Sequence, residues 1–424
     1  MAVFRRRLEF PFLRAEGGVR LKHAVLIALG DELLSGIRRE GNCSWLAERL
    51  TRAGWRVDCM EILPDGKDSL SKYLEKWVGT TDLLVLSGGL GPTHDDCTRE
   101  ALSSFLGVSL ETADDAYDSV LARYPAEMRI LLEKCRDTQG TVPEGTRPVH
   151  NPVGSALGIA LEISGTKIFA FPGVPSEYRA MAEQELAREI IPLKNGTASV
   201  LVTGWPESLL KDRLEPVISR QELHISILPS FGFVEIFIRG NPADVVRAEN
   251  DLRMLVPGDC LPPGSRSLEE AVIQGSAQRG LTSACAESCT GGLVGAALTS
   301  VPGSSAVFFG SAVCYSNSAK KSILSVSENT LSHFGAVSSQ CAAEMAEGAL
   351  RIFGTDLAVS VTGIAGPEGG SADKPVGTVW FGIAGKGRTD AVKKLFHGDR
   401  SAIRNRASMF ALLCLWRKVS GPDE

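Results

Sequence analysis

Residues 82–98 read DLLVLSGGLGPTHDDCT, and this stretch decides the fold of the first half of the chain. Its opening residues, 82–87, form an almost continuous apolar run, and the lack of polar alternation is typical of a strand buried on both faces. The glycines that follow predict a tight turn whose backbone can approach a ligand closely. The polar end of the stretch leads into a helix that we expect to begin near Thr98.

Similar apolar runs occur on either side of this strand, and segments with helical periodicity separate them. We expect further strands at 24–29, 55–62 and 168–171, and helices at 42–53, 69–78 and from 176 to about 190. Buried strands that alternate with helices predict a parallel sheet covered on both faces. The fold class is therefore α/β, with a doubly wound domain over residues 23–195.

Residues 196–264 have a different pattern, which includes two adjacent strands and a turn-rich linker at 256–264. We expect strands at 199–203, 223–228 and 233–239, and helices at 207–218 and 243–255. Within 233–239, Val234, Ile236 and Ile238 share one face of the strand and alternate with the residues of the other face. This pattern predicts a small split α+β unit, which we interpret as a connector. Residues 265–424 return to alternating strands and helices and predict a carboxy-terminal α/β domain.

The composition of the 424 residues is that of an ordinary globular protein, with 44% hydrophobic and 22% charged residues. A formal net charge of −5 provides no basic field, so a nucleic-acid partner is not expected. The ten cysteines include no CxxC pair, which indicates a reduced, cytoplasmic protein and not a disulfide framework or a zinc site. No apolar run approaches the roughly 20 residues needed to span a bilayer, so no membrane partner is expected.

The first 22 residues carry five arginines around a few apolar positions. They lack the unbroken apolar stretch of a secretory signal. We interpret residues 1–22 as a disordered extension or as the result of a start codon assigned too early.

Residues 286–292 read AESCTGG and follow the apolar strand predicted at 281–285. They place the hydroxyl of Ser288 at an expected helix start, where unpaired N–H groups bind anions. The simplest interpretation is a helix cap, but a serine with a nearby base is also a nucleophile. Few histidines are present, so a desolvated lysine of the segment 315–321, YSNSAKK, is the alternative base. Lys320 and Lys321 both remain open, as does the simpler interpretation that they lie on a solvated helix face.

Two further loops add candidates for substrate binding. The loop 362–370, TGIAGPEGG, follows a strand and contains four glycines, and Arg400 in the segment GDR offers a guanidinium to a phosphate. The candidates are Thr362, Gly363, Gly366, Gly369 and Arg400.

The segments AESCTGG, YSNSAKK, GAVSS, TGIAGPEGGSADKPVGTVWFG and GDR, in this order, resemble the carboxy-terminal domain of the CinA family over residues 268–418. The resemblance implies hydrolysis of nicotinamide mononucleotide to nicotinic acid mononucleotide and ammonia, without a cofactor. It implies that Ser288 is the nucleophile, Lys320 the base and Tyr315 an assisting residue. Backbone N–H groups near Thr290, Gly291 and Gly292 are expected to stabilise the oxyanion or to hold the phosphate, and both roles remain open.

A second site is expected at the carboxyl ends of the amino-terminal strands, where open α/β sheets bind ligands. The segments 30–36, GDELLSG, and 87–98 both follow strands. Their glycines suit phosphate, and nearby carboxylates suit a hard divalent cation such as Mg²⁺. The phosphate candidates are Gly88, Gly89 and Gly91, and the metal candidates are Glu32, Asp65, Asp95 and Asp96. Alternatively, Asp95 and Asp96 only cap the next helix.

These two segments, together with NPVG at 151–154 and FPGVPSE at 171–177, resemble the molybdopterin-binding-like amino-terminal domain of the CinA family. The resemblance implies a metal-dependent ADP-ribose pyrophosphatase that forms AMP and ribose 5-phosphate. The family usually has Asn-Thr-Asn where this chain has Glu40-Gly41-Asn42, so only Asn42 remains as a substrate-binding candidate. The segment 204–208, GWPES, resembles the start of the family's KH-like unit, which lacks a GxxG loop here and is interpreted as structural.

The resemblance leaves two alternatives to this pair of hydrolase activities. One is that the amino-terminal domain binds molybdopterin. The other, which follows from the family's association with competence and DNA damage, is a non-enzymatic protein that interacts with recombination factors. The two hydrolase activities imply small-molecule nucleotides as partners, namely nicotinamide mononucleotide and ADP-ribose. By analogy with related proteins, we also expect a second copy of the chain in a homodimer.

Overall fold

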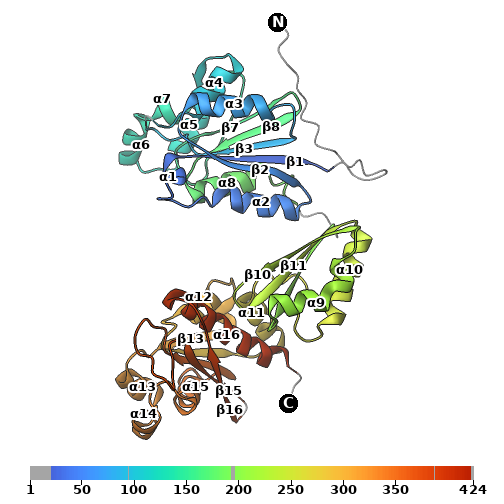
Figure 1. Cartoon of the computed structure of the whole chain (residues 1–424). Helices are drawn as coiled ribbons and strands as arrows, with labels where there is room; N and C mark the ends of the chain where they lie inside the picture. Colours follow the sequence, from blue (N-terminus) through green and yellow to red (C-terminus); the bar gives the residue numbers. More distant parts are fainter. Residues whose placement is uncertain (1–20, 94, 192–195, 386, 422–424) are drawn as a thin grey trace. The chain divides into compact units, whose positions relative to one another are not determined.

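The computed structural model describes residues 21–93, 95–191, 196–385 and 387–421 (Figure 1). The predicted extension at 1–22 lies outside the described residues except for its last two. The chain forms two compact units, one ending at Thr197 and one beginning at Ala198. The second unit contains both the middle segment and the carboxy-terminal domain.

The first unit is built on a six-stranded sheet in the order β2-β1-β3-β8-β7-β6. The strands are β1 (His23–Leu29), β2 (Arg56–Leu63), β3 (Leu83–Ser87), β8 (Thr166–Phe171), β7 (Gly158–Ile163) and β6 (Arg147–Val149). The first four are parallel to one another, and β7 and β6 add an antiparallel edge. Every residue of β3 is buried, as its apolar run predicted.

Helices cover both faces of this sheet, which confirms the doubly wound α/β domain (Figure 1). Helices α2 (Asn42–Arg52) and α8 (Pro175–Glu185) pack on one face, and α3 (Lys67–Trp77) and α4 (Thr98–Leu106) on the other. Alternate residues of β1 serve the two cores: Leu26 faces α2, whereas Ile27 faces α3.

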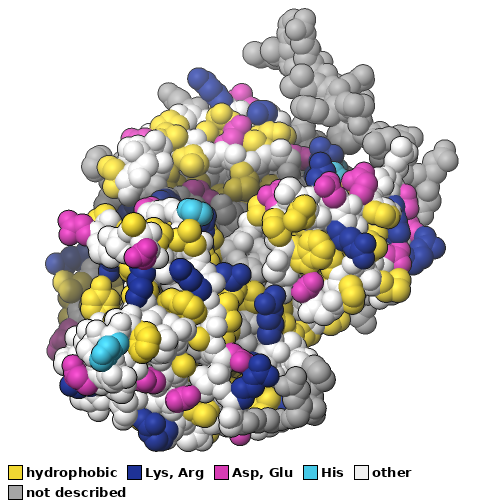
Figure 2. All heavy atoms as spheres, turned by 60° about the horizontal axis from the view of Figure 1, so that its bottom comes forward, with side chains coloured by type: hydrophobic (Ala, Val, Ile, Leu, Met, Phe, Trp, Pro, Cys, Tyr) yellow, Lys and Arg dark blue, Asp and Glu magenta, His cyan; other side chains and the backbone are white. Residues whose placement is uncertain are grey.

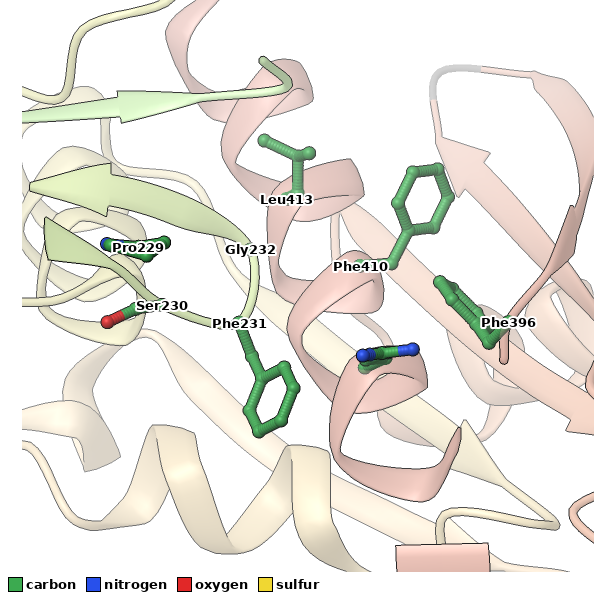
Figure 3. Close-up of a pocket in the computed structure, with 8 residues that line it drawn as sticks. Pro229, Ser230, Phe231, Gly232, Phe396, Phe410 and Leu413 are labelled. Carbon is green, nitrogen blue, oxygen red and sulfur yellow. The ribbon is translucent and has the colours of Figure 1, made fainter. Parts of the chain in front are cut away.

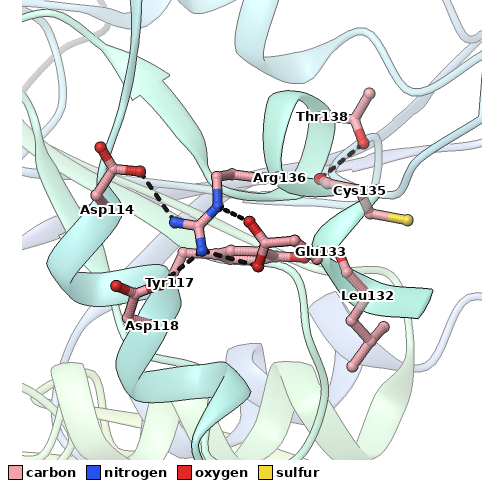
Figure 4. Close-up of polar contacts among 8 residues, drawn as sticks. All are labelled: Asp114, Tyr117, Asp118, Leu132, Glu133, Cys135, Arg136 and Thr138. Atoms are coloured by element: carbon pink, nitrogen blue, oxygen red, sulfur yellow. Dashed lines mark hydrogen bonds and ion pairs between the residues drawn. The ribbon is translucent and has the colours of Figure 1, made fainter. Parts of the chain in front are cut away.

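A short insertion between α4 and β6 was not predicted from the sequence, because its elements are brief and largely polar. It contains β4 (Leu110–Thr112), α5 (Asp114–Leu121), α6 (Ala126–Glu133), α7 (Arg136–Gln139) and β5 (Thr141–Pro143). Arg136 joins its helices, since the guanidinium pairs with Asp114 at 2.9 Å and with Asp118 and Glu133 at 2.5 Å (Figure 4). It also lies 5.2 Å from the ring centroid of Tyr117.

The second unit begins with a three-stranded sheet in the order β10-β11-β9. Its elements are β9 (Thr197–Thr203), α9 (Glu207–Ile218), β10 (Leu223–Pro229), β11 (Phe233–Gly240) and α10 (Pro242–Leu255). Val234, Ile236 and Ile238 are buried in one core with residues of both helices, on the face that the alternation of β11 predicted.

The middle segment also packs against the carboxy-terminal domain. Leu201 and Leu261 belong to the same core as helix α16 (Arg400–Ser420). The turn between β10 and β11, 229–232, borders a cavity of about 730 Å³ together with Phe396 and residues of α16 (Figure 3). The middle segment is therefore part of the second unit and does not form a separate body.

The carboxy-terminal domain has a five-stranded sheet in the order β13-β12-β14-β15-β16, which confirms the predicted α/β class. The strands are β12 (Ser283–Glu287), β13 (Phe308–Val313), β14 (Leu357–Gly363), β15 (Thr378–Gly385) and β16 (Arg388–Leu395). The first three are parallel, and β15 and β16 are antiparallel additions. β16 was not predicted, because it is a polar edge strand whose residues are exposed or half-buried.

Two groups of helices cover this sheet (Figure 1). Helices α11 (Leu268–Arg279), α12 (Leu293–Thr299) and α16 pack on one face. Helices α13 (Asn317–Leu324), α14 (Glu328–His333) and α15 (Ser339–Phe353) pack on the other. The sheet thus separates side chains that are adjacent in sequence into two environments.

On the face shown in Figure 2, basic and acidic side chains are interspersed with hydrophobic ones. Among the helices that the structure describes, none has the length and apolar character needed to cross a membrane.

A buried arginine holds the loop after β3 against the insertion. The guanidinium of Arg99 donates to the carbonyl oxygens of Leu90 at 2.7 Å, Thr141 at 2.9 Å, Gln139 at 3.2 Å and Leu157 at 2.9 Å. Burial lowers the pKa of Arg99 to about 10.

We predict that Arg99→Met lowers the free energy of unfolding of the first unit by at least about 3 kcal/mol, because four buried carbonyls lose their donor. Arg56→Met, which removes a largely exposed ion pair with Asp58, is the control and should cost less than about 1 kcal/mol. Hydrogen–deuterium exchange of peptides from β1 and β3 measures both effects. Equal protection in the two variants would contradict this role of Arg99.

Candidate functional site

Ser288 directly follows β12, an inner strand of the carboxy-terminal sheet that lies between β13 and β14. Its main-chain N–H donates to Val361 O at 2.9 Å, so pairing with β14 continues one residue beyond the strand. Ala286 belongs to the core beneath α15, whereas Cys285 belongs to the core beneath α16. Because strand side chains alternate, Ser288 points to the α13 and α15 side of the sheet, and Glu287 points to the α12 side.

Lys320 reaches Ser288 from helix α13, whose first turn is capped by Ser316. Its Nζ lies 2.9 Å from Ser288 Oγ, 2.9 Å from Cys314 O and 3.2 Å from Tyr315 O. A carbonyl oxygen can only accept, so two hydrogens of the amine are directed to Cys314 and Tyr315. In the neutral amine, the remaining position is a lone pair that faces the Ser288 hydroxyl.

The environment of Lys320 favours that neutral form. The side chain is 1% exposed, and burial lowers the pKa of its amine, although nearby thiols and Tyr315 oppose the shift. Lys321 is exposed and forms an ion pair with Glu328. The structure therefore places only one of the two candidate lysines beside Ser288.

A cavity of about 180 Å³ opens next to this pair. At its rim, Arg400 donates to Gly366 O at 2.8 Å and to the Tyr315 hydroxyl at 3.2 Å. Thr362 donates to Ala336 O at 2.7 Å and so ties the end of β14 to the loop before α15. The cavity is lined by Ser288, Cys289, Tyr315, Asn317, Lys320, Ala336, Val337, Thr362, Gly363, Ala365 and Arg400.

Some of the site residues that the sequence predicted line this cavity. Ser288, Lys320, Tyr315, Thr362, Gly363 and Arg400 line the cavity; Thr290, Gly291, Gly292, Gly366 and Gly369 are not among its lining residues. Sequence reasoning missed five lining residues, all of which lie in the quoted segments: Cys289, Asn317, Ala336, Val337 and Ala365. The only signal for them was the segments themselves, because no side chain in this set has a chemistry that singles it out.

The predicted helix start at Ser288 was wrong. β12 extends to Glu287, and helix α12 begins only at Leu293, with Gly292 as its capping residue at φ +98°. The buried Glu287 carboxylate accepts from the N–H groups of Gly292 at 2.8 Å, Val294 at 3.2 Å and Gly295 at 2.9 Å. The anion at this helix start is thus a side chain of the protein. The polar Glu287 led the sequence analysis to end the strand two residues early.

The turn between Ser288 and α12 is braced from α16. Arg404 donates to Cys289 O at 3.0 Å and to Thr290 O at 2.8 Å. The Thr290 hydroxyl is buried and, among the described residues, has no hydrogen-bond partner. The N–H of Gly291 donates to Ser288 O at 3.1 Å, so this amide closes the turn.

In the first unit, the glycines after β3 serve close packing. Gly88 and Gly89 have φ of +105° and +67°, and a Cβ on Gly88 would lie 2.6 Å from Leu29 O. The carboxylate of Asp96 accepts from Thr93 N at 2.9 Å and Thr93 Oγ1 at 2.6 Å, and a Cβ on Gly91 would lie 2.4 Å from it. The Asp96 carboxylate therefore closes the loop in which it lies by accepting hydrogen bonds from Thr93.

The other predicted metal candidates form an acidic cluster that includes Asp31, which the sequence analysis missed. Asp31 N donates to Asp65 Oδ2 at 3.0 Å, and Asp65 N donates to Asp31 Oδ1 at 3.4 Å. Burial raises the pKa of Asp65, and the charges of Asp31, Glu32 and Asp95 raise it further. Among the described residues, no three His, Cys, Asp or Glu side chains converge in a way that could hold a metal ion. The described donors at this edge of the sheet therefore give no geometric support to a metal site.

Asn42 lies beneath the same loops. Its amide nitrogen donates to Ser87 Oγ at 3.0 Å and to Gly173 O at 2.9 Å, so it joins α2 to the ends of β3 and β8. The Glu40 carboxylate accepts from Cys43 N at 2.6 Å and Ser44 N at 3.1 Å. Glu40, part of the departure from the usual Asn-Thr-Asn, therefore occupies the N-terminus of α2.

Comparisons with known proteins identify relatives over nearly the whole chain. Residues 265–419 match the family described as "CinA C-terminal domain", and residues 25–191 match "Probable molybdopterin binding domain". A CinA-like protein of Akkermansia muciniphila is 37% identical over 398 residues, which cover 91% of this chain and 95% of that protein. A CinA-like protein of Thermosipho melanesiensis is 34% identical over 405 residues, which cover 94% of this chain and 100% of that protein.

A solved structure is similar to part of the chain. The competence damage-inducible protein A of Klebsiella pneumoniae is 37% identical, and the match covers 37% of this chain and 97% of that one, with a TM-score of 0.36.

We predict that Asp65→Asn makes the first unit more resistant to heat at pH 7. A carboxyl whose pKa is raised by folding destabilises the fold when ionised, so the gain should vanish below the unfolded pKa of about 3.9. The rate of limited proteolysis of the first unit, followed against temperature, measures the effect. Asp58→Asn is the control of opposite sign, because Asp58 pairs with Arg56 and His23. A less resistant Asp65→Asn variant at pH 7 would contradict the repulsion.

Proposed function

The chain belongs to the CinA family, and on that premise we propose that its carboxy-terminal domain hydrolyses the carboxamide of nicotinamide mononucleotide. The contact of 2.9 Å between Lys320 Nζ and Ser288 Oγ carries the proposal, because it joins a nucleophile to a buried amine inside a cavity. The products are nicotinic acid mononucleotide and ammonia.

The reaction begins with attack of Ser288 Oγ on the amide carbonyl while Lys320 Nζ accepts the hydroxyl proton. Collapse of the tetrahedral intermediate breaks the C–N bond, and Lys320 returns the proton to the departing nitrogen, so ammonia leaves. Water then attacks the acyl ester while Lys320 Nζ accepts a proton from it. The C–O bond to Ser288 Oγ breaks, and Lys320 returns that proton to Oγ, which regenerates both side chains. Cys314 O and Tyr315 O keep the amine oriented through each transfer.

The oxyanion of the tetrahedral intermediate needs N–H donors that are not already hydrogen-bonded within the protein. The amides of Gly292, Val294 and Gly295 are bonded to Glu287. Cys289, the residue after the nucleophile, lines the cavity, and its N–H is our candidate donor.

The size of the cavity fits one end of the substrate. Drug-sized ligands occupy pockets of about 300–1,000 Å³, whereas this cavity holds about 180 Å³. We therefore assign it to the pyridine ring and its carboxamide. The phosphate then lies outward, near the rim formed by Arg400 and Tyr315, where the guanidinium supplies positive charge.

For the amino-terminal domain, the resemblance supports ADP-ribose pyrophosphatase activity with a divalent metal, while the carboxylate geometry offers no independent support. Release of AMP from ADP-ribose with added Mg²⁺ is the assay that separates this activity from molybdopterin binding. A Ser288 variant that lacks deamidase activity but retains a role in competence or DNA repair would favour the non-enzymatic alternative.

We predict that Ser288→Ala abolishes ammonia release from nicotinamide mononucleotide, because no nucleophile remains. Lys320→Met should lower kcat by about 10²–10⁴-fold, the range typical of a lost general base. Lys321→Met is the matched control and should retain activity, since its amine faces solvent. A coupled ammonia assay measures all three, and full activity in Ser288→Ala or Lys320→Met would remove that residue from the mechanism.

A further inference from the structure

Glu287 is a fully buried carboxylate directly before Ser288, and the proposed reaction does not use it. A charged group in such a position is costly unless its acceptor sites are filled. Here they are filled: Glu287 accepts from three amides at the start of α12, those of Gly292, Val294 and Gly295, at 2.8–3.2 Å. It also accepts from the Ser311 hydroxyl at 2.8 Å. The carboxylate therefore binds the start of α12 and strand β13 together.

The main chain carries this anchorage to the catalytic pair. Cys314 N donates to Glu287 O at 2.8 Å, and Cys314 O accepts from Lys320 Nζ at 2.9 Å. Lys320 Nζ in turn contacts Ser288 Oγ. Glu287, Cys314, Lys320 and Ser288 thus form a closed ring of covalent and hydrogen-bonded links.

The two neighbouring side chains point to opposite faces of the sheet. Fixing Glu287 on the α12 side therefore fixes the rotation of the strand end, and with it the direction of the Ser288 Cα–Cβ bond. Rotation of this strand end would carry Ser288 Oγ away from Lys320. Misplacement of a reacting group by about 1 Å can cost about 10²-fold in rate.

We propose that Glu287 is a positioning residue that holds Ser288 Oγ within reach of Lys320 by anchoring the end of β12 to the start of α12. The inference rests on the proposed function for its substrate, but the position of the hydroxyl can be tested without that substrate.

A carboxylate suits this position because it accepts hydrogen bonds and donates none. In Glu287→Gln, an NH₂ group replaces one of the two oxygens. This group is a donor, and it faces main-chain or hydroxyl donors that the oxygen had accepted from, so those hydrogen bonds are lost. The side chain keeps its size, so the substitution alters the hydrogen bonds and charge with little change of volume. The strand end should then lose its fixed rotation.

The test measures the rate at which a fluorophosphonate probe labels Ser288 in the full-length chain, read by mass spectrometry of the labelled peptide. The control is Ser267→Ala, which removes a helix cap in the same domain, at the start of α11. Glu287→Gln should label at least about 10-fold more slowly than the wild type, and Ser267→Ala at the wild-type rate. In the ammonia assay, Glu287→Gln should lower kcat by a similar factor and leave KM within about twofold.

Labelling of Glu287→Gln at the wild-type rate would overturn the proposal, as would a wild-type chain that does not label at Ser288. If Glu287→Gln does not fold, Ser311→Ala replaces it, since this variant removes one donor and keeps the charge; an unchanged labelling rate would again overturn the proposal. A wild-type chain that labels but releases no ammonia would refute the proposed substrate, while the labelling rates would still decide the role of Glu287.

Discussion

The carboxy-terminal site depends on one buried amine that is held by two main-chain carbonyls. Lys320 contacts Cys314 O, Tyr315 O and Ser288 Oγ, and burial lowers the pKa of the amine. The carbonyls direct two hydrogens away from the serine, so the lone pair of the neutral amine has only one place to point. Helix α13 supplies the amine, and the residues that directly follow β13 supply both carbonyls.

The side chains of β12 alternate between the two faces of the sheet, so Glu287 and Ser288 have different surroundings. Ser288 faces the cavity, whereas Glu287 faces α12 and occupies its N-terminus. Because the helix dipole is already balanced by a carboxylate, that helix start is not available to a substrate phosphate. In the proposed reaction, positive charge for the substrate phosphate would come instead from Arg400, on the first turn of α16.

The first unit shows the same use of carboxylates for internal contacts. Glu40 caps α2, Asp96 closes the loop after β3, and Asp31 and Asp65 accept each other's amides. The two units thus share an architecture, in which parallel strands end beside polar loops. They differ in that the second unit brings a serine hydroxyl and a buried amine into contact, at Ser288 and Lys320.

The sequence predicted the parallel sheets well, because unbroken apolar runs such as 82–87 have few alternatives to burial on both faces. It failed for β16, whose polar residues resemble a loop, and for the insertion 110–143, whose elements are too short to show a period. For the site, spacing alone could not choose between Lys320 and Lys321, since the serine lies 32 residues away in the chain and the choice depends on which side of α13 is buried. The start of α12 was predicted too early because a charged residue such as Glu287 usually indicates that a buried strand has ended, whereas here Glu287 is the last residue of β12.

The most direct test of this account is the pKa of the Lys320 amine, measured by NMR titration of its ¹³Cε resonance and assigned with the Lys320→Met variant. The account predicts a midpoint below the value of about 10.4 for a free lysine side chain. A midpoint at or above that value would contradict it, because a lysine that stays charged cannot accept the proton of Ser288.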